Sequence, residues 1–228
     1  MLVERDWSVL GIARGSARIG HVAYQHLQCD LSDYFSFVTE LPSTIEPLLA
    51  SQSWQRVGLV NNAALTGHLG RTSEFDLTEW GRVQTANLTA PMLLTAMVDR
   101  LTEASAALRV VNVSSGVAVQ AFPGMAAYST SKAALRMGGM ILAKEWESDV
   151  PNAHRDDAAI LSYEPGIVDT RMQADARSRS QKDFPWVKMF TDFHERGALV
   201  PAERPAAEIV EFLESDKQPY FSERRLRS

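Results

Sequence analysis

The chain has 228 residues, of which 45% are hydrophobic and 22% charged, and its formal net charge is −5. This length suits a single α/β domain whose core needs no disulfide, and Cys29 is the only cysteine. Scattered basic residues in an acidic chain argue against nucleic acid as the main partner, and no apolar stretch approaches the roughly 18 residues that span a bilayer. Because the charged residues 4–6 also interrupt any signal peptide, we expect a cytoplasmic protein with neither a nucleic-acid nor a membrane partner.

In chain order, short apolar runs alternate with longer helical patterns. Strands are expected at residues 8–13, 21–29 and 56–60, and helices at residues 34–51 and 79–104. Pro42 is expected to break the first helix, because Ser43 and Glu46 behind it have the spacing of a capping box. The second helix is expected to start or kink near Pro91.

The second half of the chain continues this pattern. A strand at residues 108–113 is followed by a helix at 126–148, a strand at 158–163, a long excursion at 164–201 with a helix near 186–195, a helix at 203–214 and a short closing strand at 220–221. Such alternation is typical of βαβ units. The sequence therefore predicts an α/β fold, a doubly wound parallel sheet of the Rossmann type, in one domain spanning residues 1–228.

Tyr128 and Lys132 carry the strongest chemical signal. Their spacing of four places both side chains on one face of the predicted helix. An unperturbed phenol has a pKa of about 10, and a neighbouring ammonium favours the phenolate. The spacing therefore predicts a tyrosine of lowered pKa that acts as an acid–base group, although an isolated pair of this kind also fits an ordinary surface.

Two polar residues upstream strengthen this interpretation. Ser115 lies 13 residues before Tyr128, directly after a predicted buried strand, where its hydroxyl can donate to a substrate oxygen. Asn87 lies inside a helical pattern that disfavours asparagine, so it is expected to bend the helix or to hold a water. A polar residue on a solvated face is the alternative for Asn87.

With these residues in view, the sequence resembles the short-chain dehydrogenase/reductase family from Trp7 onward. The matching segments are Asn61-Asn62-Ala63-Ala64, with Ala64 in place of a glycine, Asn87, Val111-Asn112-Val113-Ser114-Ser115, Tyr128 with Lys132, and Pro165-Gly166-Ile167-Val168-Asp169-Thr170. The resemblance implies a catalytic set of Asn87, Ser115, Tyr128 and Lys132. In that set Tyr128 protonates the carbonyl oxygen that Ser115 positions, Lys132 lowers the tyrosine pKa and holds the ribose, and Asn87 links Lys132 to water.

The resemblance also implies a nicotinamide cofactor and no metal. Its contacts are expected from Asn62, Ala63, Ala64, Tyr128, Lys132, Pro165, Gly166, Val168 and Thr170. Arg14 follows the first expected strand with no carboxylate close behind it, which favours NADPH, although an ordinary surface arginine is the alternative. Asp30 and Leu31 resemble the family's pair beside the adenine.

Within the family, residues 162–173 and 190–201 are similar to sepiapterin reductases and bacterial benzil reductases. This similarity implies a homodimeric reductase of small ketones or vicinal diketones, with the dimer interface on the helices at 79–104 and 126–148. Glu223 is the nearest candidate for the acidic anchor of a pterin substrate. Five apolar residues are expected to line a substrate pocket, or else to be plain core or dimer contacts: Phe122, Met125, Met172, Trp186 and Phe190.

The dinucleotide-binding half is expected to lack its first strand and glycine-rich loop. Residues 11–17 half resemble that loop, but only 19 residues separate Gly11 from Asp30, which is too short for a βαβ unit. We therefore expect residues 2–6 to be the last turn of a first helix and Ser8 to begin the second strand. An upstream extension is then expected to encode a strand and the motif Gly-x-x-x-Gly-x-Gly, which would bind pyrophosphate.

Two functions follow from these observations. The first is an NADPH-dependent carbonyl reductase, favoured by the complete catalytic set. The second is a non-catalytic binding or regulatory protein that has kept the fold and lost the cofactor, favoured by the missing loop.

Overall fold

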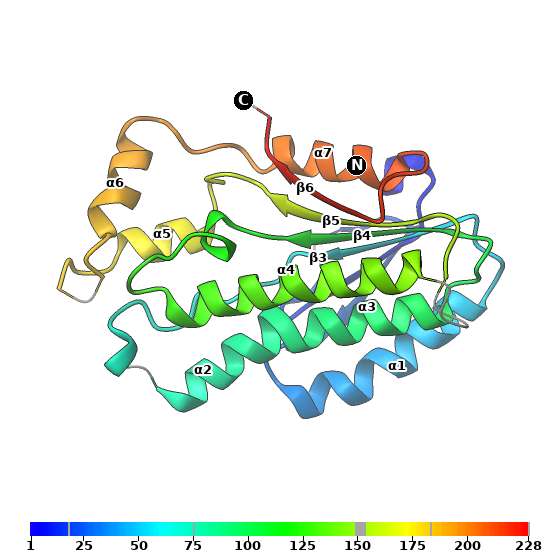
Figure 1. Ribbon diagram of the computed structural model, residues 1–228, viewed down its shortest axis with the longest axis horizontal. Coiled ribbons are helices and arrows are strands. Elements are labelled where there is room, and N and C mark those ends of the chain that lie inside the picture. Colours follow the sequence, from blue (N-terminus) through cyan, green and yellow to red (C-terminus); the bar gives the residue numbers. More distant parts are fainter. Residues whose placement is uncertain (18, 75, 149–153, 183, 228) are drawn as a thin grey trace.

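A computed structural model describes residues 1–17, 19–74, 76–148, 154–182 and 184–227. Parallel strands form a central layer with helices on both faces, α1, α3 and α4 on one side and α7 on the other (Figure 1). This arrangement confirms the predicted α/β class. No helix among the described residues is both long enough and apolar enough to cross a membrane.

The strands fall into two hydrogen-bonded groups. In the first, β1 (Val9–Ala13) pairs in parallel with β2 (Tyr24–Gln28). The second is parallel in the order β3 (Arg56–Asn61), β4 (Ala107–Val113), β5 (Ala158–Glu164) and β6 (Phe221–Arg225). No ladder joins β1 to β3 in the described part of the chain. The single sheet expected from the sequence is therefore divided in two at this point.

A short connection joins β1 to β2. Residues 14–17 and 19–23, between β1 and β2, contain no helix, so these two strands do not form a βαβ unit. Before β1, the turn Val3–Arg5 is a short 3-10 helix that ends at Asp6 with a left-handed φ of 60°. The expected helical turn before the first described strand is therefore present.

The helices follow most of the predicted boundaries. They are α1 (Tyr34–Ala50), α2 (Leu77–Gln84), α3 (Ala90–Leu101), α4 (Ala126–Glu147), α5 (Arg171–Arg177), α6 (Val187–Glu195) and α7 (Glu203–Glu214). Short 3-10 turns lie at Thr72–Glu74 and Gly116–Ala118. The sequence did not predict α5, which lies inside the long excursion.

The expected break at Pro42 is wrong, because α1 continues through both Pro42 and Pro47. Asp33 caps its start by accepting hydrogen bonds from the amides of Phe35 and Ser36. Phe37, Leu41 and Ile45 recur every four residues and bury one face of the helix. This burial outweighs the roughly 3 kcal/mol that an interior proline costs a helix.

The core consists of two apolar layers on opposite faces of the sheet. Along β4 and β5 the side chains alternate, so that Val110 and Ile160 pack with Trp146 of α4 while Val111 and Leu161 pack toward α7. A third cluster joins β1 and β2 to α1 and α3, and it includes Cys29, which is 3% exposed. Burial, with the Glu40 carboxylate as a second cause, raises the pKa of the Cys29 thiol to about 11.

Candidate active site

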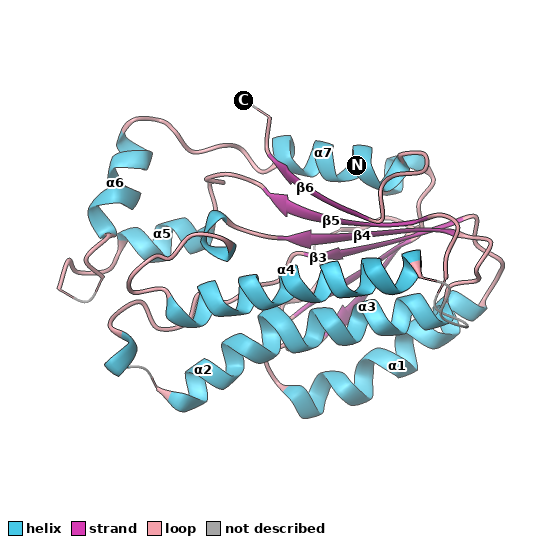
Figure 2. Cartoon of the chain, viewed as in Figure 1, coloured by secondary structure: helices cyan, strands magenta, loops and turns pink. Residues whose placement is uncertain are grey.

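The residues predicted to act together follow the carboxyl ends of five parallel strands. Arg14 follows β1, Asp30 follows β2, Asn62 follows β3, Ser115 follows β4 and Pro165 follows β5. The carboxyl ends of parallel strands meet at one edge of a sheet, and open α/β sheets bind their ligands there. The helices α5 and α6 lie beyond this edge, past the arrowheads of β4 and β5 (Figure 2).

Asn87 occupies the middle of a π-helical segment, Thr85–Thr89, between α2 and α3. Its fully buried side chain holds Leu65 in the loop after β3, donating to the Leu65 carbonyl and accepting from the Leu65 amide, both at 2.8 Å. The same amide donates to the Ser131 hydroxyl of α4 at 3.0 Å. The helix is thus irregular at Asn87, and α3 starts beside Pro91, which lies in its first turn, as the sequence also predicts.

Tyr128 and Ser115 meet at the start of α4. Tyr128 is 8% exposed, and the Ser115 hydroxyl lies close enough to its phenol to influence the phenol's pKa. Burial raises the pKa of Tyr128, and the nearby Ser115 hydroxyl lowers it by less. The expected lowering of this pKa by Lys132 is therefore wrong, because loss of solvation dominates.

Lys132 lies one helical turn after Tyr128 and is 2% exposed. Its ammonium donates to the Val113 carbonyl at 2.7 Å and lies 5.8 Å from the centre of the Tyr128 ring. Burial lowers the pKa of Lys132 to about 8. An ammonium has three donors, and Val113 uses one of them, so this buried cation can hold further oxygen acceptors.

The turn after β2 holds the pair predicted beside an adenine. Asp30 accepts hydrogen bonds from the Ser32 amide at 2.9 Å and from the Ser32 hydroxyl at 2.7 Å, while Leu31 is buried in the core. Burial raises the pKa of Asp30, but the Ser32 hydrogen bonds and then the charges of Arg14 and Arg82 lower it by more in total. The exposed Arg14 is therefore close enough to Asp30 for their charges to interact.

The segments after β3 and β5 complete the edge. Asn62 and Ala63 are exposed, and Ala64 packs against the apolar cluster that contains Tyr128. After β5, Pro165 is partly buried and Gly166 has a φ of +74°, which favours glycine.

The next residues of this segment bring it back to the chain before α7. Val168 forms a parallel bridge with Val200, and Thr170 precedes the first turn of α5. Backbone groups of the segment at 165–170 thus lie beside the ends of the strands, as the sequence predicts.

An apolar cluster covers Tyr128. Its buried members are Leu69, Met125, Tyr128, Ala176 and Phe184, with Ala64, Val117, Phe122, Val187 and Phe190 packed against them. The Phe122 and Trp186 rings meet edge to face with their centres 5.6 Å apart. Three of the five predicted pocket residues, Phe122, Met125 and Phe190, thus belong to the cluster that contains Tyr128, and Trp186 contacts it through Phe122, whereas Met172 on α5 is not among its members.

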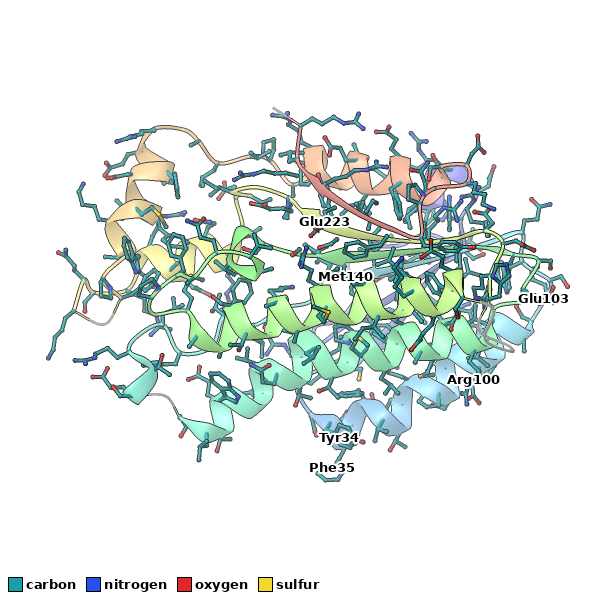
Figure 3. The ribbon with its side chains drawn as sticks, in the orientation of Figure 1. Tyr34, Phe35, Arg100, Glu103, Met140 and Glu223 are labelled. Atoms are coloured by element: carbon teal, nitrogen blue, oxygen red, sulfur yellow. The ribbon has the colours of Figure 1, made fainter. Side chains whose placement is uncertain are left out.

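Glu223, the candidate anchor, forms an ion pair within the chain. It lies on β6 and accepts two hydrogen bonds from Arg136 of α4, at 2.6 and 2.7 Å, and Figure 3 labels it beside β6. These hydrogen bonds hold the pKa of the Glu223 carboxyl below its usual value. Its carboxylate is already neutralised within the chain.

Several residues of the site had no signal in the sequence. Ser131 joins Asn87 to α4, and Phe184 and Leu69 complete the apolar cluster. Arg82 reaches the turn after β2 from α2, with Nε and Nη2 at 3.4 and 3.2 Å from the Ser32 hydroxyl. Because these contacts join segments about 50 residues apart, local spacing alone does not predict them.

Comparisons with known proteins agree with this geometry. The family model described as short chain dehydrogenase matches residues 1–181. Benzil reductase ((S)-benzoin forming) of Bacillus subtilis is 32% identical over 216 residues, which cover 93% of this chain and 85% of that protein. Sepiapterin reductase of Bos taurus is 31% identical over 216 residues, covering 93% and 72%.

The fold is also found among solved structures. A short-chain dehydrogenase/reductase from Saccharomyces cerevisiae superposes with a TM-score of 0.79 at 21% identity, covering 97% of this chain and 87% of that one.

Proposed function

The chain belongs to the short-chain dehydrogenase family, and on that premise we propose that it is an NADPH-dependent reductase of ketones and vicinal diketones. The observation that carries the proposal is the gathering of Ser115, Tyr128 and Lys132 where β4 ends. Asn87 fastens the loop after β3 to the helix that bears Tyr128. A hydroxyl donor, a phenol and an ammonium in one buried place suit proton delivery to a carbonyl oxygen.

The side chains fit a nicotinamide dinucleotide at both of its ends. The unused donors of the buried Lys132 ammonium suit the hydroxyls of a ribose. Asp30 and Leu31 would border the adenine, and the exposed Arg14 would meet the 2′-phosphate. At the nicotinamide end, Asn62, Ala63, Ala64 and the backbone of Pro165, Gly166, Val168 and Thr170 would complete the site.

The chain's own residues would manage the proton. When bound, NADPH supplies the hydride. The Ser115 hydroxyl positions the substrate oxygen. The raised pKa of Tyr128 keeps its phenol protonated, and the phenol donates this proton to the oxygen. Lys132 stabilises the phenolate that remains, and Asn87 holds the π-helical turn beside it.

The apolar cluster over Tyr128 supports an aromatic or bulky substrate. Phe122 and Phe190 belong to the apolar cluster that contains Tyr128, and Trp186 packs on Phe122, whereas a charged substrate would lose solvation there. Two of the relatives are named for benzil and sepiapterin, which are substrates of those proteins. We therefore propose benzil-like diketones ahead of pterins, since Glu223 is engaged by Arg136.

The test measures the oxidation of NADPH and of NADH in the presence of benzil, for the parent chain and for Tyr128→Phe. The variant should keep nucleotide binding and lose about 10²- to 10⁴-fold in kcat, because it removes the proton donor. Tyr24→Phe is the matched control, because its phenol lies on β2 against His26, away from Ser115. Equal activity of Tyr128→Phe and the parent would overturn the mechanism.

A second function has one observation in its favour. No backbone ladder joins β1 to β3, so the two ends of the cofactor site stand on separately bonded sheets. A non-catalytic binding protein would tolerate this division. A reductase is expected to bind NADPH with a micromolar Kd, and NADPH at 100 times that Kd should add about 2.7 kcal/mol to the free energy of unfolding. If NADPH at this concentration does not raise the melting temperature, the result favours the non-catalytic function.

The proposal extends to assembly and location. Exposed apolar side chains of α3 and α4, namely Met92, Met137 and Ile141, suit a homodimer interface. A single buried thiol suits the reducing cytoplasm.

A further inference from the structure

Arg82 connects α2 to the turn that follows β2. Its guanidinium donates from Nε and Nη2 to the Ser32 hydroxyl, at 3.4 and 3.2 Å. The Ser32 hydroxyl in turn donates to Asp30 Oδ1 at 2.7 Å. A planar cation is thereby held beside a carboxylate at the edge where β1 and β2 end.

Arg82 forms no ion pair with another described residue. Neither Arg82 nor Arg14 lies within 4.0 Å of a carboxylate in the described ranges, yet the charges of both lower the pKa of Asp30. Two cations therefore act on the Asp30 carboxylate without forming an ion pair with it. Since Arg82 is exposed and its two bonds to a neutral hydroxyl are long, its guanidinium retains capacity for a ligand.

The two arginines differ in how they are held. No hydrogen bond fixes Arg14 to another described residue, so its guanidinium can turn toward a phosphate. Arg82 is fixed by Ser32 beside Asp30, whose negative charge would repel a phosphate placed on the same spot. A neutral, flat base with an amino group suits this second position, because Asp30 accepts from the amino group and a guanidinium plane stacks on the ring.

We propose that Arg82 is a binding residue for the adenine base of the cofactor, acting through its guanidinium plane and independently of the 2′-phosphate. This inference rests on the proposed function, since it presupposes the nucleotide site. It assigns affinity for the adenosine half to Arg82 and preference for NADPH over NADH to Arg14.

The test is isothermal titration calorimetry with 5′-AMP and 2′,5′-ADP, which differ by the 2′-phosphate. Arg82→Ala should weaken both nucleotides by the same factor, about tenfold, as expected for the loss of a stacked cation. Arg14→Ala should weaken 2′,5′-ADP and leave 5′-AMP unchanged. Arg82→Lys, which keeps the charge without the plane, should remain weaker than the parent with both nucleotides.

Arg100→Ala is the matched control, because Arg100 is an exposed arginine of α3 that pairs with Glu46 at the far end of the helix (Figure 3). It should bind as the parent does. If Arg82→Ala loses affinity for 2′,5′-ADP alone, Arg82 is a phosphate ligand and the inference is overturned. Unchanged affinity for both nucleotides would also overturn it. If the parent binds neither nucleotide, the proposed cofactor site itself fails, and the inference fails with it.

Discussion

At the scale of single residues, Lys132 combines burial with charge. Its ammonium is almost fully removed from water, and among the described residues its one hydrogen-bond acceptor is the Val113 carbonyl. Burying a cation with so few partners destabilises the folded state. A position of this kind is retained for what it binds, at a cost to stability.

This cost can be measured with Lys132→Met. The pKa of Lys132 falls from 10.5 to about 8, so the charged form destabilises the fold by about 3 kcal/mol below pH 8. The methionine variant loses one hydrogen bond, worth about 1 kcal/mol, and should be about 2 kcal/mol more stable than the parent at pH 7. Between pH 8 and 10.5 the unfolded state binds more protons than the folded one, so the parent gains stability and this difference should shrink.

Urea unfolding across this pH range measures the sign of the stability difference between Lys132→Met and the parent. Lys144→Met is the control, because Lys144 lies on the same helix with its side chain 80% exposed and should show no such change between pH 8 and 9.5. A Lys132→Met variant that is less stable than the parent by a constant amount would contradict the expectation.

The site residues show what spacing does and does not predict. A separation of four correctly placed Tyr128 and Lys132 on one helix face. It did not predict the direction in which the pKa of Tyr128 shifts, because the spacing reveals a neighbouring charge but not the burial that removes solvent from the phenol. The ion pair of Glu223 was not predicted for a similar reason, since its partner Arg136 is 87 residues away in sequence.

At the scale of elements, α1 contains two prolines that its packing overrides. Pro47 is exposed near the end of the helix, where it removes one intrahelical donor. Pro47→Ala should therefore raise the free energy of unfolding by about 2 kcal/mol, that is, the roughly 3 kcal/mol of proline in a helix less up to 1 kcal/mol of unfolded-state entropy. Thermal and urea unfolding measure the change.

Pro201→Ala is its control. Pro201 is exposed and precedes α7, so its replacement should leave stability unchanged or lower it by up to about 1 kcal/mol. An equal gain in both variants would show that the helix is not the cause.

Long periodic segments were the predictable elements. The apolar runs of β4 and β5 and the boundaries of α4, α6 and α7 lie within a residue or two of the expected ones. The seven residues of α5 carry too short an apolar pattern to be recognised. The start of α3 near Pro91 was predictable because proline is common in the first turn of a helix, whereas the irregular turn at Asn87 depends on tertiary hydrogen bonds.

At the scale of the whole molecule, the exposed side of α3 and α4 is the surface to test for assembly. Ile141 is 54% exposed and Met137 51%, on the face of α4 away from the sheet. Ile141→Glu should convert a dimer to monomers, because it buries an unpaired charge in the interface. Size-exclusion chromatography with light scattering gives the mass.

Phe35→Glu is the control for general surface effects. Phe35 is 81% exposed at the start of α1 and points away from the other helices in Figure 3. It should leave the mass unchanged. A parent chain that is monomeric at micromolar concentration would contradict the proposed homodimer.

The division of the sheet has a mechanical meaning. Within β3–β6, each step from strand to strand is fixed by backbone hydrogen bonds at a spacing of about 4.8 Å. Between β1 and β3 the spacing is set by side chains instead, chiefly Leu10, Ile12 and Leu59 against the shared helices. The adenosine end and the carbonyl end of the proposed cofactor site thus lie on two separately hydrogen-bonded sheets, whose relative position depends on the packing of these apolar side chains.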